Sequence, residues 1–223
     1  MDNRINIHME SIKLIHAIAG SIVGIAGLLQ ILLKKGGPRH RLIGQAYFWA
    51  WLVVVVTGSL IGSTLIALLG VLGFYMALTG FRFGRSKAVE IAVFDKMAIA
   101  AALAVALGTL GWGTYLLLRG GNMFGWVALF FGVIFSLTAG QDFREFVLGR
   151  PIRKLSGHPM QWYFEHFGRM YISYIAAMTA FAVIQNLFNP ALLNWILPTI
   201  IGTILLMLTN RRYFARYQIE PKK

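Results

Sequence analysis

The residues from 42 to 81 include no charged side chain, and this uncharged run constrains the fold more than any other feature of the sequence. About 20 apolar residues in a helix are enough to cross the hydrocarbon core of a bilayer, so the run is too long for a single crossing. Gly58, Gly62 and Ser63 lie near its middle. The sequence therefore predicts two membrane-spanning helices here, 42–61 and 64–81, joined by a very tight turn.

Five further stretches have the length and apolar character of membrane spans. They are predicted at residues 14–33, 97–118, 123–140, 167–187 and 192–208. The composition agrees with this pattern, because 57% of the residues are hydrophobic and only 13% are charged, whereas charged residues make up about a quarter of a soluble domain. We therefore expect an all-α integral membrane bundle of seven transmembrane helices, a single domain over residues 1–223, with 141–165 as a polar loop.

Basic residues are distributed unevenly between the two predicted ends of the bundle. The formal net charge is +13, and of the 21 Lys and Arg residues only Arg4, Lys13 and Arg119 fall at the end that includes the N-terminus. Because basic residues accumulate on the cytoplasmic side of membrane proteins, we expect the N-terminus outside, the C-terminus in the cytoplasm and the 141–165 loop on the cytoplasmic side. The basic end is then expected to contact anionic lipid head groups, so the charge does not require a nucleic-acid partner.

Several classes of chemistry are excluded by residues that the chain lacks. It has no cysteine, which rules out disulfides, thiolate metal sites, iron–sulfur clusters and cysteine nucleophiles. The sequence also lacks a phosphate-binding GxxxxGK[ST] loop, a dinucleotide fingerprint after a strand, an HExxH zinc motif and a GxSxG serine elbow. Any catalytic role must therefore be sought among the polar residues of the predicted helices.

Four ionisable residues from four different helices are predicted at one depth, the cytoplasmic end of the bundle: His40, Asp95, Asp142 and His166. Ionisable groups inside a membrane bundle are costly, and they generally face the protein interior or a water-filled space. We therefore expect the four side chains to converge in one polar pocket that opens to the cytoplasm.

Three interpretations of this cluster remain open. His40 and His166 are suited to be the axial ligands of a haem b in an electron-transfer protein, with Asp95 and Asp142 tuning the site. The haem propionates would then pair with Arg41, Arg144 and Arg169. Alternatively, the same His and Asp residues are ligands for zinc in a metal-dependent hydrolase. In the third interpretation, a transporter or a scaffold without catalysis, they relay ions or anchor the helix ends beside Arg41, Lys96, Arg144 and Arg169.

His16 is a separate polar candidate near the opposite end of the bundle. The first helix must cross a hydrocarbon core of roughly 30 Å before His40 appears, so His16 cannot share a metal with His40 or His166. We expect its ring either to line an outer cavity or to be a buried histidine with its hydrogen bonds satisfied.

The same positions resemble an uncharacterised bacterial group of multi-pass membrane proteins, the domain-of-unknown-function 2306 group and its relatives. The shared residues are His16 and Gly20, His40-Arg41-x-x-Gly44-x-x-Tyr47, Tyr75 with Leu78-Thr79-Gly80, Asp95, Asp142-x-Arg144, and His166-x-x-Arg169-Met170 followed by Ser173-Tyr174. The resemblance covers about residues 15–185 and departs at Arg169, where Trp is typical. It implies a bacterial cytoplasmic (inner) membrane location, and it marks His16, His40, Asp95, Asp142 and His166 as the positions to test. It implies no activity or substrate.

Overall fold

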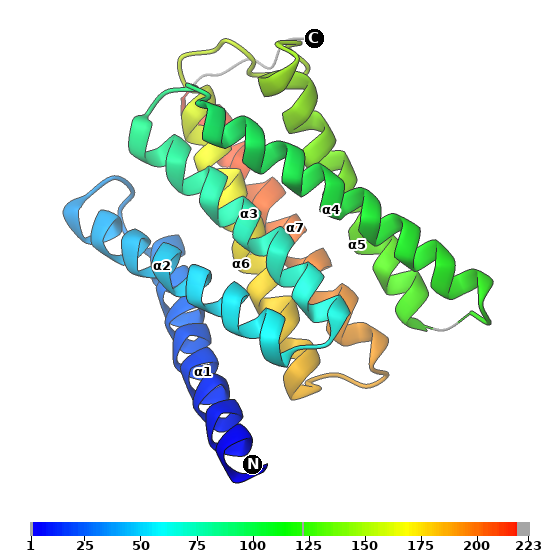
Figure 1. The fold of residues 1–223 in the computed structure, drawn as a ribbon. Helices are drawn as coiled ribbons and strands as arrows, with labels where there is room; N and C mark the ends of the chain where they lie inside the picture. The colour runs from blue at the N-terminus through cyan, green and yellow to red at the C-terminus, as the bar shows by residue number, and fades with distance from the viewer. Residues whose placement is uncertain (1, 122, 218–223) are drawn as a thin grey trace.

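In the part of the chain that the structure describes, the protein forms seven long helices and no strand (Figure 1). The structure, a computed structural model, describes residues 2–121 and 123–217, with the side chains described from residue 7 onwards. The helices are α1 (Asp2–Leu32), α2 (Pro38–Ile61), α3 (Thr64–Ser86), α4 (Val93–Leu118), α5 (Met123–Asp142), α6 (Gln161–Gln185) and α7 (Leu192–Arg216). All seven are long and apolar enough to cross a membrane, so the prediction of an all-α fold with seven helices of membrane-spanning length is confirmed for the described residues.

The uncharged run divides between α2 and α3, where only Gly62 and Ser63 separate the two helices. The side chain of Ser63 caps α3 by accepting a hydrogen bond from the backbone N–H of Ile66, which satisfies one of the free donors at a helix start. Other helices extend beyond the apolar stretches that predict them. α3 continues to Ser86, α4 begins at Val93 and α6 begins at Gln161, so polar residues at that end lie on helices rather than in loops.

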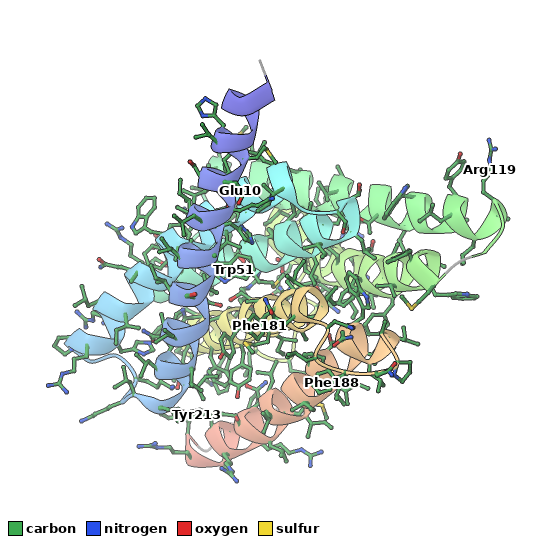
Figure 2. The ribbon with its side chains drawn as sticks, turned by 90° about the horizontal axis from the view of Figure 1, so that it is seen from below. Glu10, Trp51, Arg119, Phe181, Phe188 and Tyr213 are labelled. Atoms are coloured by element: carbon green, nitrogen blue, oxygen red, sulfur yellow. The ribbon has the colours of Figure 1, made fainter. Side chains whose placement is uncertain are left out.

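Two hydrophobic clusters divide the interior. The larger cluster joins α3, α4, α5, α6 and α7 around Met76, Phe135 and Trp195. The smaller one joins α1, α2, α3 and α6 around Tyr47 and Trp51. Figure 1 shows the α1–α2 pair on one side of α3 and α6 and the α4–α5 hairpin on the other, with Arg119 at the tip of that hairpin (Figure 2). α3 and α6 therefore lie centrally and contribute to both clusters.

The polar connection predicted at 141–165 is shorter than expected and folds inward. Gln141 and Asp142 still belong to α5, a π-helical turn follows at Phe143–Val147, and α6 has already begun at Gln161. Only residues 148–160 lie outside helices. The aromatic and aliphatic side chains of the π-helical turn pack against the larger cluster, so the first part of the predicted loop belongs to the packed bundle.

Candidate functional site

His40 and His166 line one cavity of about 700 Å³ between α1, α2, α3 and α6, which we call the histidine cavity. The centres of the two imidazole rings lie 6.3 Å apart, and the ring planes are almost perpendicular, at 82°. The cavity wall is rich in aromatic side chains, among them Tyr47, Trp162 and Tyr174. The structure thus brings together the two histidines that the sequence places at one depth on separate helices.

His166 is fixed against α3 through two glycines on one face of that helix. Its Nδ1 lies 2.8 Å from the carbonyl oxygen of Gly80, and because a carbonyl only accepts, Nδ1 is the protonated donor. In the neutral ring, Nε2 is then the nitrogen with a free lone pair. One turn further along α3, Gly84 lies directly against the imidazole. A histidine whose N–H is bound to a backbone carbonyl is oriented as metal-binding histidines usually are.

Gly84→Ala is expected to displace the ring of His166. A Cβ at position 84 would lie 2.5 Å from Nδ1 and 2.9 Å from Cγ of His166, closer than packed atoms approach. We expect weaker binding of any ligand held by His166, measured by titration of the purified variant. Gly168→Ala, on α6 itself with open space around the added carbon, is the matched control; equal effects of the two substitutions would contradict this packing argument.

His40 lies in the first turn of α2, and its Nδ1 is buried without a hydrogen-bond partner. A buried polar atom without a hydrogen bond lowers the stability of the fold by about 1–3 kcal/mol. A histidine with a purely structural role usually has its ring nitrogens hydrogen-bonded, and Nδ1 of His40 does not. Close by, the Lys35 ammonium donates to the last carbonyls of α1, those of Gln30 and Ile31. Burial lowers the pKa of Lys35 below its ordinary value.

Asp142 lies in a buried charge network that is separate from the histidine cavity. Its side chain is fully buried, and both oxygens accept hydrogen bonds from Arg169 at 2.6 and 2.7 Å in a bidentate pair. The Tyr75 hydroxyl and Arg153 also donate to this carboxylate. Arg169 further donates to the Thr79 hydroxyl at 3.0 Å. A bidentate guanidinium–carboxylate pair fixes both partners in position, so Asp142 joins α5 to α3 and α6.

The same network extends into the 148–160 connection. Arg153 pairs with Glu145 at 3.0 Å and with Glu165 at 3.4 Å, and Ser156 and Gln161 donate to Glu145 at 2.6 and 2.7 Å. We call Asp142, Glu145, Arg153, Glu165 and Arg169 the arginine network. It has three carboxylates and two guanidinium groups, and each of them has a partner of opposite charge. These residues therefore hold the segment against the bundle.

Asp95 caps the start of α4 and has a different partner. Its carboxylate accepts a hydrogen bond from the backbone N–H of Ala92 at 2.8 Å and forms a bidentate pair with Arg82 of α3. Asp95 and Asp142 both line a second cavity, of about 800 Å³, beside the C-terminal end of α3. Lys96, the cation adjacent in sequence, is exposed.

The expectation of a single pocket containing all four residues is not met, since the histidines line one cavity and the aspartates the other. The reason is the rotation of α3, which lies between them. Gly80 and Gly84 contact His166 on one face of this helix, whereas Tyr75, Thr79 and Arg82 bind the network and Asp95 on another. Equal depth in the membrane does not determine which face of a helix a residue occupies.

The three arginines that were expected to pair with haem propionates lie in different surroundings. Arg41 lines the histidine cavity. Arg169 is used by Asp142 and Glu165, and Arg144 is exposed on the π-helical turn and is not among the cavity residues. Near the middle of α1, which begins earlier than the predicted span, His16 forms a 2.8 Å hydrogen bond between its Nδ1 and the Thr57 hydroxyl of α2. His16 is therefore a half-buried histidine with a hydrogen-bond partner.

Both sites also include residues that were not among the predicted site residues. Lys35, Gly84 and Arg85 border the histidine cavity, and Glu145 and Arg153 complete the arginine network. The i, i+4 spacing of Gly80 and Gly84 was a usable signal, since small residues at that spacing permit close contact along one helix face. No such signal marks Arg153 among the many cations at this end of the bundle.

Comparison with known proteins gives no relative from which to transfer a function. No protein-family model, no curated protein and no solved structure matches the chain. The resemblance to the domain-of-unknown-function 2306 group therefore stays a prediction, and the function must be argued from the site.

Proposed function

We propose that this protein is a haem b-binding electron-transfer protein of a bacterial cytoplasmic membrane, with His40 and His166 as the axial ligands. The observation that carries the proposal is the pair of imidazoles, 6.3 Å apart in one aromatic-lined cavity. Two imidazoles that bind one metal ion at about 2 Å from opposite sides have ring centres about 6 Å apart. The donor type, the number of donors and their separation are thus compatible with axial ligation of one iron.

Further features of the two rings support a ligand role. His166 donates Nδ1–H to Gly80, which leaves Nε2 for a metal. His40 has a buried nitrogen without a partner, and metal binding at a site often compensates for the polar groups that the site buries. When bound, haem b would supply one-electron chemistry, and the protein would supply the two imidazoles and the enclosing cavity.

A zinc hydrolase is supported less well by the same residues. In residues 2–121 and 123–217 no three or more His, Asp or Glu side chains lie close enough together to hold a metal ion. A catalytic zinc site usually has three protein ligands and an open position. Here Asp95 and Asp142 are engaged by Arg82 and Arg169, away from the imidazoles.

The proposal is tested on the purified full-length protein. Expressed with haem supply and purified in detergent, it is expected to be red, with a Soret band that shifts on reduction. A colourless protein that also fails to take up added haem would overturn the proposal and leave the transporter or scaffold interpretation as the better one.

Orientation is a separate prediction, motivated by the concentration of basic residues at one end of the bundle. With the N-terminus outside, a topology reporter inserted after Gly120, in the turn that follows Arg119 at the tip of the α4–α5 hairpin, is expected to report the periplasmic side. A reporter fused to the C-terminus is expected to report the cytoplasm. Two reporters on the same side of the membrane would refute the seven-span topology, and exchanged sides would refute the orientation alone.

A further inference from the structure

The histidine cavity has a cationic rim. Arg41 at the start of α2 and Arg85 and Lys87 at the end of α3 line it with exposed side chains, and Lys35 contributes a half-buried ammonium from the α1–α2 turn. None of the described residues that line this cavity is acidic. Four cations therefore surround one opening without an anion among them.

These cations are also free of ion pairs elsewhere. Arg41, Arg85 and Lys87 form no salt bridge within the described residues, and Lys35 bonds only to backbone carbonyls. Four carboxylates at this end are used by other groups: Asp95 binds Arg82, and Asp142, Glu145 and Glu165 belong to the arginine network. Glu90, three residues after Lys87, is exposed and lines the second cavity, and it forms no salt bridge with the cationic rim in the described part of the chain. Like charges grouped without a counter-ion repel one another and attract an anion.

Behind the cationic rim, the cavity is lined by flat apolar surfaces. Trp49, Tyr47, Phe81, Trp162 and Tyr174 contribute aromatic surface to the same space that contains the two imidazoles. Ligand sites of this size are typically apolar with a few polar groups that orient the ligand. The distribution of charge thus matches a molecule with an apolar, planar body and an acidic edge.

We propose that Lys35, Arg41, Arg85 and Lys87 form an anion clamp that binds the carboxylate groups of a porphyrin whose ring occupies the aromatic part of the histidine cavity. This inference rests on the proposed function for the identity of the ligand, and it adds which residues select it. The clamp recognises the acidic edge, while the histidines recognise the metal. The two contributions are therefore separable by experiment.

Metal-free protoporphyrin IX and its dimethyl ester are the probes, since neither offers iron to His40 or His166 and only the first has free carboxylates. Binding is followed by quenching of tryptophan fluorescence, because Trp49 and Trp162 line the cavity. We expect the free acid to bind at least about tenfold more tightly than the ester in the unmodified protein, as charge-assisted pairs are the stronger hydrogen bonds. In Arg41→Gln/Arg85→Gln this preference is expected to fall to near one.

Two further variants control for folding and for nonspecific charge. Both clamp arginines are exposed, so their exchange is expected to be tolerated by the fold, and Arg41→Lys/Arg85→Lys, which keeps the charges, is expected to retain part of the preference. Arg144→Gln/Arg150→Gln removes two exposed arginines from outside the cavity and is expected to retain all of it.

The outcomes distinguish the clamp from the ligand assignment. Equal affinity for acid and ester, binding of neither, or an equal loss in the Arg144→Gln/Arg150→Gln control would overturn the clamp. If the free acid binds more tightly than the ester, and its affinity changes neither when iron is present in the porphyrin nor in His40→Ala, the clamp is supported and axial ligation is refuted. If affinity depends on iron but is the same for the free acid and the ester, the histidine ligands are supported and the clamp is refuted.

Discussion

Alanine at His40 or at His166 is expected to abolish haem retention by the purified protein, whereas alanine at His16 is expected to leave it intact. The ring centres of His40 and His166 lie 6.3 Å apart in the histidine cavity, and no other described His, Asp or Glu is grouped with them to replace a lost ligand. His16 instead forms a hydrogen bond with Thr57, near the C-terminal end of α2, whereas His40 lies in the first turn of that helix. Bound haem is measured as the pyridine haemochrome per mole of protein.

If His40→Ala and His166→Ala both kept their full haem content, the two histidines would not be the haem ligands, even if the parent protein is red. Loss of haem in His16→Ala alone would show that the cofactor lies at the opposite end of the bundle. Each variant is compared with Gly168→Ala, which adds a single carbon beside the site where nothing contacts it. This control separates loss of a ligand from a general effect of substitution near α6.

The second large effect is expected on stability, from Asp142→Ala. The substitution leaves the buried Arg169 without its bidentate partner and removes one of the carboxylates that bind Arg153. Removing one member of a buried ion pair typically costs about 3–5 kcal/mol, and because Arg169 keeps Glu165 as a partner, we expect the lower part of that range. We expect a clearly lower midpoint of thermal unfolding in detergent, followed by circular dichroism.

Glu10→Ala is the matched comparison for that experiment. Glu10 also pairs with a cation, Lys13, but 72% of its side chain is exposed, and exposed pairs contribute about 0–1 kcal/mol. The difference between the two variants therefore measures how much more a buried, multiply bonded carboxylate stabilises the fold than an exposed carboxylate with one lysine partner. If Asp142→Ala unfolded at the same temperature as Glu10→Ala, the arginine network would not stabilise the fold.

The number and character of the helices were predictable from the sequence because membrane spans are defined by length and hydrophobicity alone. The uncharged run of residues 42–81 required a break, and the break occurs at Gly62 and Ser63. The position of His40 and His166 near the starts of two long helices was predictable for the same reason. Their proximity across two helices follows the expectation, although their role as ligands stays a prediction.

The grouping of side chains about each helix axis was not predictable in the same way. Tyr75 lies in an apolar stretch that gives no sign of its hydrogen bond to Asp142. Arg153 is one of several cations in a connection that was expected to be a polar loop, yet its guanidinium pairs with the buried carboxylates of Asp142 and Glu145. Hydrophobicity determines how deep a residue lies, whereas these partnerships depend on rotation and on how the 148–160 segment folds back.

The central helices α3 and α6 are held in a fixed register where the C-terminal half of α3 meets the start of α6. On α6, His166 and Arg169 lie about one turn apart, and they bind Gly80 and Thr79, which are adjacent on α3. A rotation of α6 about its own axis would separate at least one of these pairs, and a slide along the axis would separate both. The position of the His166 imidazole in the cavity is therefore set partly by Arg169, a residue outside the cavity, so that a change at Thr79 or Arg169 would reach the histidine through the backbone of α6.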